Sequence, residues 1–321
     1  VAFSFSLVFA TQAEEKKITA KTNEALQAAI DTAKPGDVLY YQQLTNSTVV
    51  IKRQIKIQKN ITLENRGPGS VMLDGSNKTR LFSVNKGKLK LSGFNVTNGR
   101  VSANGGAFHV KDKAELELVG TSIYDCTANA HGGAIYCGEA TKLVLNNVTI
   151  SHNVARIGGG LFCDNTAKPS SVVMKNVTFF ENEATMSKSG REYSESFFRY
   201  TGRTEFNVEK SIIVGKAFNG NGNFKETYYS EGILHSSNAS TGVDGSKPGF
   251  DLESTGLKTI ADNGGLVKTV AISSSSFLAS KNWGASPFNA TSNGVLIAGK
   301  SKNESLFLYL GMSLMYFGIA L

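Results

Sequence analysis

The strongest constraint on the fold is a repeat between Lys88 and Asn182. A glycine pair followed by apolar residues occurs three times, and successive copies begin 27 and then 26 residues apart. Each copy follows a short segment in which apolar and polar residues alternate, the pattern of a half-buried strand. A period in the twenties with two or three strands per copy is typical of a solenoid of β rungs. The three copies are Gly105-Gly106-Ala107-Phe108, Gly132-Gly133-Ala134-Ile135 and Gly158-Gly159-Gly160-Leu161, preceded by Lys88–Leu91, Glu115–Leu118 and Lys142–Leu145.

The repeat predicts an all-β fold, a right-handed parallel β-helix. In such a coil alternate side chains point into a shared interior, and each rung bonds to its neighbours, so that no rung is stable alone. The sequence holds 33 glycines and 5 prolines, which suits many tight corners and few interruptions of the strand ladder. The alternative is a β-sandwich with glycine turns, but the near-constant repeat length argues against it.

The chain divides into five predicted segments. Residues 1–13 are expected to be a truncated signal peptide, with a buried N-terminal strand as the alternative. Thr22 is expected to cap a helix that runs to about Ala33, has Leu26 on its apolar face, and covers the open end of the solenoid. The predicted boundaries are 1–13 signal peptide, 14–37 capping helix, 38–288 β-helix, 289–305 linker and 306–321 hydrophobic tail.

The hydrophobic tail predicts attachment to a membrane surface. Residues 306–321 carry no charge, yet they are fewer than the roughly 20 residues that span a bilayer. The small residues at Ser292–Gly294, a polar spacer and this tail fit a GPI-attachment signal. A short C-terminal membrane helix is the alternative, and the sequence leaves the two open.

Several motifs resemble known secreted β-helix proteins. The repeats GGAF, GGAI and GGGL, with ISHN at Ile150–Asn153 and FFEN at Phe179–Asn182, resemble the GGA(I/L/V) and FxxN repeats of chlamydial polymorphic outer membrane proteins. The stretches Lys210–Gly215 and Ala261–Thr269 resemble the final rungs of the choice-of-anchor Q family. The resemblance covers about residues 20 to 288. It implies the fold, and it implies little about function because these families are defined by architecture.

Composition excludes some classes of function. The net charge is +8, but no run of Lys and Arg exceeds two residues, so we expect a weakly cationic surface and no nucleic-acid partner. Three cysteines and four histidines show no metal-ligand spacing, and we expect no cofactor. Cys137 and Cys163 occupy equivalent rung positions, either as a disulfide or as a buried thiol pair, and Cys126 is left over in both cases.

Polysaccharide lyases and pectinases share this fold, so an enzyme is an alternative for this chain. Repeat register places Asp112, Glu139 and Asn165 in one column with Asp164 beside it, and such oxygen ligands could hold a cation. A solvated turn among lysines is the alternative for this column. Asp125 has no partner carboxylate within a few residues, so no acid–base pair for catalysis is apparent.

Nine N-x-S/T sequons would carry glycans if the protein is made by a eukaryote. Three of them read Asn-Val-Thr and were aligned to one place in the rung, where Asn suits a corner. The nine sites are Asn46, Asn60, Asn77, Asn95, Asn147, Asn176, Asn238, Asn289 and Asn303.

The sequence favours a non-catalytic, extracellular or surface-anchored protein of the adhesion type that binds a glycan or a protein. The segment from Ser187 to Tyr200 breaks the repeat and is predicted to bulge from the coil, where partners of solenoids usually dock. The predicted binding residues are Arg191, Tyr193, Arg199 and Tyr200. A carbohydrate-active β-helix enzyme, such as a polysaccharide lyase, is the alternative.

Overall fold

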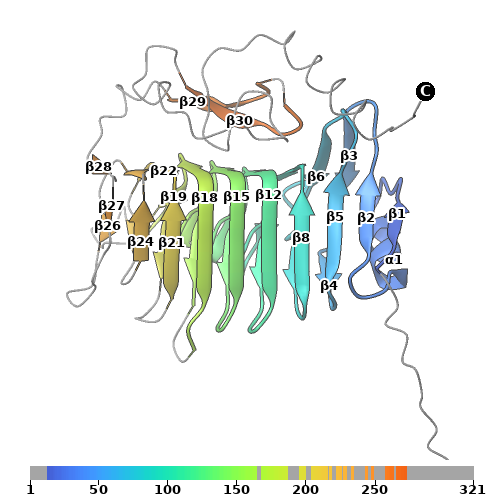
Figure 1. Cartoon of the computed structure of the whole chain (residues 1–321), viewed down its shortest axis with the longest axis horizontal. Coiled ribbons are helices and arrows are strands. Elements are labelled where there is room, and N and C mark those ends of the chain that lie inside the picture. Colours follow the sequence, from blue (N-terminus) through green and yellow to red (C-terminus); the bar gives the residue numbers. More distant parts are fainter. Residues whose placement is uncertain are drawn as a thin grey trace, which may run out of the picture.

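The computed structural model describes residues 13–164, 168–186, 195–199, 204–215, 217–218, 222–225, 227–229, 233–234, 243–244, 247–248, 257–263 and 265–272. Over these residues the chain is a right-handed parallel β-helix with one short helix, as the repeat predicted (Figure 1).

Parallel sheets form the walls of the solenoid. Consecutive strands of each wall come from consecutive rungs, which is why the numbering skips along every sheet. The first wall contains β1 (Glu15–Lys17), β2 (Val38–Tyr41), β5 (Ile61–Asn65), β8 (Lys88–Ser92), β12 (Glu115–Tyr124), β15 (Lys142–Ser151), β18 (Ser171–Phe180), β21 (Glu205–Glu209), β24 (Gly222–Lys225) and β27 (Val243–Asp244).

Strands β12, β15 and β18 are long enough to bend and continue into a second wall. There β12 pairs with β9 (Phe94–Thr97) and β18 pairs with β22 (Ile212–Ile213). The wall continues from β9 through β6 (Val71–Asp74) to β3 (Ser47–Val50), and from β22 through β25 (Tyr228–Tyr229) to β28 (Lys247–Pro248). The third wall contains β4 (Ile55–Ile57), β7 (Phe82–Val84), β11 (Phe108–Val110), β14 (Ile135–Cys137), β17 (Leu161–Cys163), β20 (Phe197–Arg199), β23 (Ala217–Phe218) and β26 (Ile233–Leu234). A short fourth sheet contains β10 (Arg100–Val101), β13 (Thr127–His131), β16 (Val154–Ile157) and β19 (Glu183–Ala184).

The strand register confirms the repeat alignment and explains the core. Phe108 pairs with Ile135, and Ile135 pairs with Leu161, so the residues after each glycine pair form one inward column. Phe82 and Phe108 stack inside with ring centroids 5.2 Å apart. Fully burying an apolar side chain of this size contributes roughly 1.5–3 kcal/mol, so stability is spread evenly along the coil.

The corners of the rungs are built from left-handed residues at matching register. Non-glycine residues adopt positive φ sparingly, and Asn and Asp do so most readily. The corner within the long strands uses Gly120 in β12 (φ 50°), Asn147 in β15 (φ 55°) and Asn176 in β18 (φ 54°). This column makes the bend that divides the first wall from the second.

The N-terminal helix caps the solenoid as predicted. Helix α1 (Asn23–Thr32) begins after Thr22, whose side-chain oxygen accepts a hydrogen bond from the Ala25 N–H at 3.3 Å. Leu26 and Ile30 are buried against the first rung. The capping segment also contains strand β1, which pairs with β2.

A buried carboxylate joins the helix end to β1. Asp37 accepts hydrogen bonds from Lys16 Nζ at 2.7 Å and from the N–H groups of Glu14 and Lys34, both at 2.9 Å. These bonds, led by the one from Lys16, hold the pKa of Asp37 well below its usual range.

All three cysteines are buried free thiols. Cys137 and Cys163 pair in register on adjacent strands, which confirms that they are equivalent and decides in favour of the thiol pair over the disulfide. Burial raises the pKa of the Cys126 thiol to about 12, so this thiol is inert.

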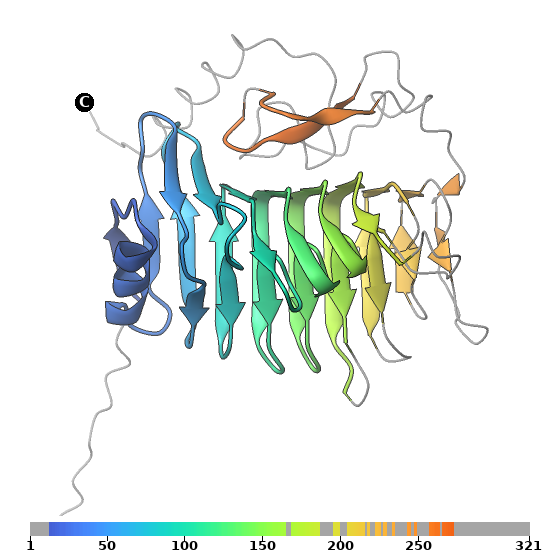
Figure 2. The same ribbon diagram turned by 180° about the vertical axis from the view of Figure 1, so that it is seen from behind.

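The C-terminal residues correct one expectation about the coil. Ala261–Thr269 was expected to form final rungs, but β29 (Leu257–Ala261) and β30 (Thr269–Ile272) form an antiparallel hairpin outside the solenoid. Asn263 favours this turn because its side-chain amide donates to the carbonyl of Thr269 at 2.9 Å. The hairpin lies along the outer side of the second wall (Figure 2).

Candidate functional site

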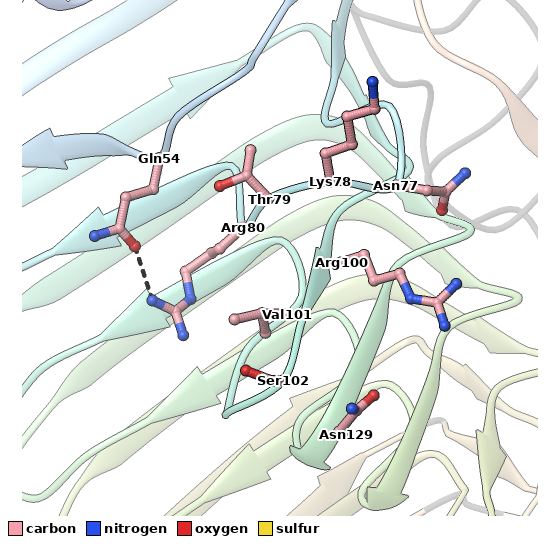
Figure 3. A pocket seen from close by; sticks show the side chains of 9 residues that line it. All are labelled: Gln54, Asn77, Lys78, Thr79, Arg80, Arg100, Val101, Ser102 and Asn129. Carbon is pink, nitrogen blue, oxygen red and sulfur yellow. Dashed lines mark hydrogen bonds between the residues drawn. The ribbon is translucent and has the colours of Figure 1, made fainter.

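A recess of about 380 Å³ opens on the solenoid surface near its N-terminal third. We call it the basic recess because three of its lining residues, Lys78, Arg80 and Arg100, carry positive charge and none is acidic. The other lining residues are Gln54, Asn77, Thr79, Val101, Ser102 and Asn129 (Figure 3). These residues come from four consecutive rungs. At about 4.8 Å per rung, the recess extends roughly 14 Å along the solenoid axis.

The loop that carries Lys78 is built around Asp74. The Asp74 Oδ1 atom accepts hydrogen bonds from the Ser76 N–H at 2.7 Å and from the Asn98 side chain at 3.0 Å. This is the turn that an Asp side chain makes with the backbone two residues on. The Asp74 carboxylate therefore holds the loop in shape and joins it to Asn98 of the next rung.

Backbone bonds between rungs bring the recess residues together. The Asn77 N–H donates to the Asn98 carbonyl at 2.8 Å, and the Arg100 N–H donates to the Thr79 carbonyl at 3.0 Å. Residues 20 or more positions apart in the sequence thus become lateral neighbours. The long basic side chains of Lys78 and Arg100 are exposed at this position.

Arg80 is the fixed cation of the recess. Its guanidinium donates to the carbonyls of Gly105 at 2.9 Å and Asn104 at 2.6 Å, and to the Gln54 side chain at 2.8 Å (Figure 3). Burial lowers its pKa, although an arginine remains charged. Because these three partners are neutral, the bonds hold the guanidinium in place without cancelling its charge.

An aromatic ladder lies on the outside of the neighbouring third wall. The ring of His109 meets Tyr136 edge-on at 4.9 Å between centroids, and Tyr136 stacks on Phe162 at 5.6 Å. His131 stacks on the same Phe162 at 4.4 Å. The Tyr136 hydroxyl donates to Asp164 Oδ2 at 2.9 Å. Burial is the first cause that raises the pKa of Tyr136 and lowers that of His131.

Acid is expected to destabilise the fold through His109. Burial, and then the charges of Arg80 and Lys111, lower the pKa of its imidazole from 6.5 to about 4. Between these values the unfolded chain binds the proton more readily than the native chain. His109 therefore contributes stability that is complete above pH 6.5 and is lost as the pH falls toward 4.

Replacing His109 by Gln should flatten the pH dependence of the free energy of unfolding in this window by up to roughly 3 kcal/mol, at 1.36 kcal/mol per unit of pKa. Urea denaturation at a series of pH values measures this, with Lys142→Gln as an exposed-site control. A pH dependence in the His109 variant as steep as in the wild type would contradict the assignment.

The described residues of the candidate acidic column make hydrogen bonds within the protein. Asp112 Oδ1 accepts a hydrogen bond from the Glu139 N–H at 3.0 Å, and Asp164 Oδ2 accepts one from the Tyr136 hydroxyl at 2.9 Å. Among the described residues, no group of three or more His, Cys, Asp or Glu side chains is placed to hold a metal ion. Asn165 lies outside the described residues.

The predicted binding residues cannot be placed against the recess. Arg191, Tyr193 and Tyr200 lie outside the described residues, and Arg199 belongs to β20 without a described side chain. The hydrophobic tail at 306–321 and residues 1–12 also lie outside them. In the part of the chain that the structure describes, no helix is long and apolar enough to cross a membrane.

The sequons occupy varied environments, and their use stays a prediction. Asn147 and Asn176 share the left-handed corner. Asn95 instead pairs with Ser122, whose partner on the next rung is Thr149, two residues after Asn147, so Asn95 is not equivalent to the other two. Asn95 is buried, whereas Asn46, Asn60 and Asn77 are exposed. The remaining sites, Asn238, Asn289 and Asn303, lie outside the described residues.

No protein-family model and no curated protein matches the sequence. Among solved structures, the fold is similar to that of the PL6 family alginate lyase AlyGC, with a TM-score of 0.40 and 16% sequence identity. The match covers 74% of this chain and 40% of that one, so the chain spans less than half of the length of the lyase. A likeness this distant carries no statement about activity.

Proposed function

We propose that this protein is a non-catalytic β-helix that binds an acidic glycan, with the basic recess as the point of attachment. The observation that supports the proposal is the lining of the recess, which contains Lys78, Arg80 and Arg100 and, among the residues that the structure describes, no Asp or Glu. Arginine and lysine are the side chains that bind carboxylate and sulfate groups most strongly.

The shape of the recess also favours an extended ligand. It crosses four rungs, and its amide and hydroxyl groups, from Gln54, Asn129 and Ser102 among others, can bond to sugar hydroxyls between the charged contacts. Arg80 is held in advance by its carbonyl partners, so it loses little conformational freedom when a ligand binds. Arg100 and Lys78 supply charges that can adjust to the ligand.

The proposal places this binding outside the cell, at a surface or in the surrounding medium. It rests there on the sequence of residues 1–13, which is typical of a secretory signal. Detection of the protein in the extracellular or surface fraction of its source cells is the measurement that tests the location.

Arg100→Ala is expected to weaken the binding of hexagalacturonate about tenfold, which corresponds to about 1.4 kcal/mol. A charge-assisted hydrogen bond to the ligand would be lost, while the exposed position leaves the fold intact. Isothermal titration calorimetry of the wild type and the variant measures the change. Raising the salt concentration from about 50 to about 200 mM should weaken wild-type binding, because exposed charges are screened.

The matched control is Lys142→Ala, which removes one positive charge from an exposed position on the first wall. Its affinity should differ from that of the wild type by less than about twofold, since a distant exposed charge is screened. Equal binding by Arg100→Ala and the wild type would contradict the assignment of the recess. Unsaturated uronate absorbance or new reducing ends in the same mixtures would instead favour a polysaccharide lyase or hydrolase.

A further inference from the structure

The outer face of the second wall is polar but covered. Alternate residues of β9, β12, β15 and β18 point away from the core there, and most carry a hydroxyl group. We call these residues the hydroxyl face: Thr97, Ser122, Tyr124, Thr149, Ser151 and Thr178. Polar residues on the outside of a solenoid normally face water. Here all six are at most 3% exposed, and the hairpin β29–β30 lies on this side of the coil (Figures 1 and 2).

Polar contacts attach the hairpin to this wall. The Asn95 side chain donates to the Leu266 carbonyl at 3.2 Å and accepts from the Lys268 N–H at 2.8 Å. The Lys268 ammonium lies 5.0 Å from the centre of the Tyr124 ring. Asn95 thus makes two hydrogen bonds to the hairpin, and the cation–π contact of Lys268 lies beside them.

The closed arrangement leaves hydroxyl groups unsatisfied. Ser122 and Ser151 are fully buried, and neither side-chain oxygen has a hydrogen-bond partner within the described part of the chain. Burying a hydroxyl without a partner costs free energy that exposure to water or to a ligand hydroxyl would recover. The hydroxyl face thus gains hydrogen bonds when the hairpin leaves.

The hairpin also fits the wall loosely at one end. A cavity of about 230 Å³ separates its turn from strands β3 and β6. Ser47, Thr48 and Ser70 line the cavity from the solenoid, and Asp262 and Lys268 line it from the hairpin. Protein interiors are normally close-packed, so this seam is a place where the hairpin can begin to separate.

We propose that the hairpin β29–β30 is a lid over a second binding trough, and that the trough takes a neutral saccharide chain. The hydroxyl face carries no charge, and its groups both donate and accept hydrogen bonds, as sugar hydroxyls do. They repeat at the rung spacing of about 4.8 Å along a straight axis, which suits a linear polymer.

This site differs from the basic recess in location and in the charge that it selects. The lid lowers the apparent affinity, since only the open fraction of molecules can bind. A variant that opens the lid should therefore bind more tightly, and a variant that loses the face hydroxyls should bind more weakly.

The first arm of the test is Asn95→Ala, which removes the two hydrogen bonds that Asn95 makes to the hairpin and retains the six hydroxyl groups. The amides of Lys268 and Thr269 should exchange hydrogen at least tenfold faster than in the wild type. Calorimetry with cellohexaose, laminarihexaose and mannohexaose should show at least one probe that the variant binds about tenfold more tightly than the wild type. Lys142→Ala, at an exposed residue of β15 on the first wall, should change neither measurement.

The second arm is the double variant Ser122→Ala with Ser151→Ala. It should melt at a higher temperature than the wild type, exchange its hairpin amides more slowly, and bind the same hexaose at least tenfold more weakly. This variant is expected to fold because neither hydroxyl group has a hydrogen-bond partner among the described residues.

Three results would overturn the proposal. Unchanged exchange of Lys268 and Thr269 in Asn95→Ala would exclude a lid. Faster exchange without binding of any of the three hexaoses would exclude the saccharide trough. Equal binding by the double serine variant and the wild type would exclude the hydroxyl face as the site. None of these results bears on hexagalacturonate binding at the basic recess, so the two proposals fail separately.

Discussion

Gly133→Val is expected to lower the free energy of unfolding by at least about 4 kcal/mol, a loss that only severe core disruption produces. Gly133 lies where adjacent rungs approach most closely. A Cβ atom at this position would sit 2.2 Å from the Gly159 carbonyl oxygen and 2.7 Å from that of Val154. Both obstacles are backbone atoms of the neighbouring rung, so they cannot rotate away. Urea denaturation followed by circular dichroism measures the loss.

The control for this variant is Lys142→Val, which places the same side chain at an exposed strand position of a nearby rung. It should change the free energy of unfolding by no more than about 0.5 kcal/mol. A Gly133 variant as stable as this control would contradict the close stacking of rungs. Because each rung contacts only its neighbours, we also expect the damage to spread outward from Gly133.

The rungs could be predicted from the sequence because, in a solenoid, the repeat length determines which residues of successive rungs lie side by side. Spacings of 27 and 26 residues set the register in advance, and the pairing of Phe108, Ile135 and Leu161 follows it. The capping helix could be predicted because Thr22 and the apolar spacing that includes Leu26 are local signals.

The hairpin could not be predicted in the same way. Alternating residues at Leu257–Ala261 and Thr269–Ile272 fit a rung and a hairpin strand equally well, because alternation indicates a strand and not its partner. The hydrogen bond from Asn263 to the Thr269 carbonyl favours the hairpin over a rung, but the sequence alone does not reveal this bond. A resemblance to final rungs was therefore a weaker guide than the periodic part of the chain.

The basic recess was missed because its charges do not occupy equivalent rung positions. Arg100 is opposite Thr127 on β13, so reading down the repeats shows no column of arginines. A search for basic residues on adjacent rungs at neighbouring positions would have found Lys78 and Arg100. The acidic column is the opposite case, because its residues were predicted from equivalent rung positions. Its register was predictable, but the bond from Tyr136 to Asp164 depends on side-chain packing that the period does not encode.

Asn153→Ala is expected to lower the free energy of unfolding by about 3–5 kcal/mol, a loss comparable to that from truncating a large core side chain. Asn153 ends the ISHN motif and is fully buried at a corner of the coil. Its Oδ1 atom accepts from the Cys126 N–H at 3.0 Å, and its Nδ2 atom donates to the Ile123 carbonyl at 3.1 Å and to Asn182 Oδ1 at 3.0 Å. The side chain thus ties three rungs together.

Alanine would leave the Cys126 N–H and the Asn182 oxygen with fewer partners in a place that water cannot reach, and each unsatisfied buried group costs about 1–3 kcal/mol. Asn129→Ala, at an exposed asparagine, removes the same atoms and should cost less than about 0.5 kcal/mol. Asn153→Asp provides a sharper comparison, because it nearly keeps the volume and turns the donor that faces Asn182 into an acceptor. If Asn153→Ala and Asn153→Asp were both as stable as the exposed control, the hydrogen bonds of Asn153 would not hold the rungs together. The asparagine of the FxxN motif would then need another explanation.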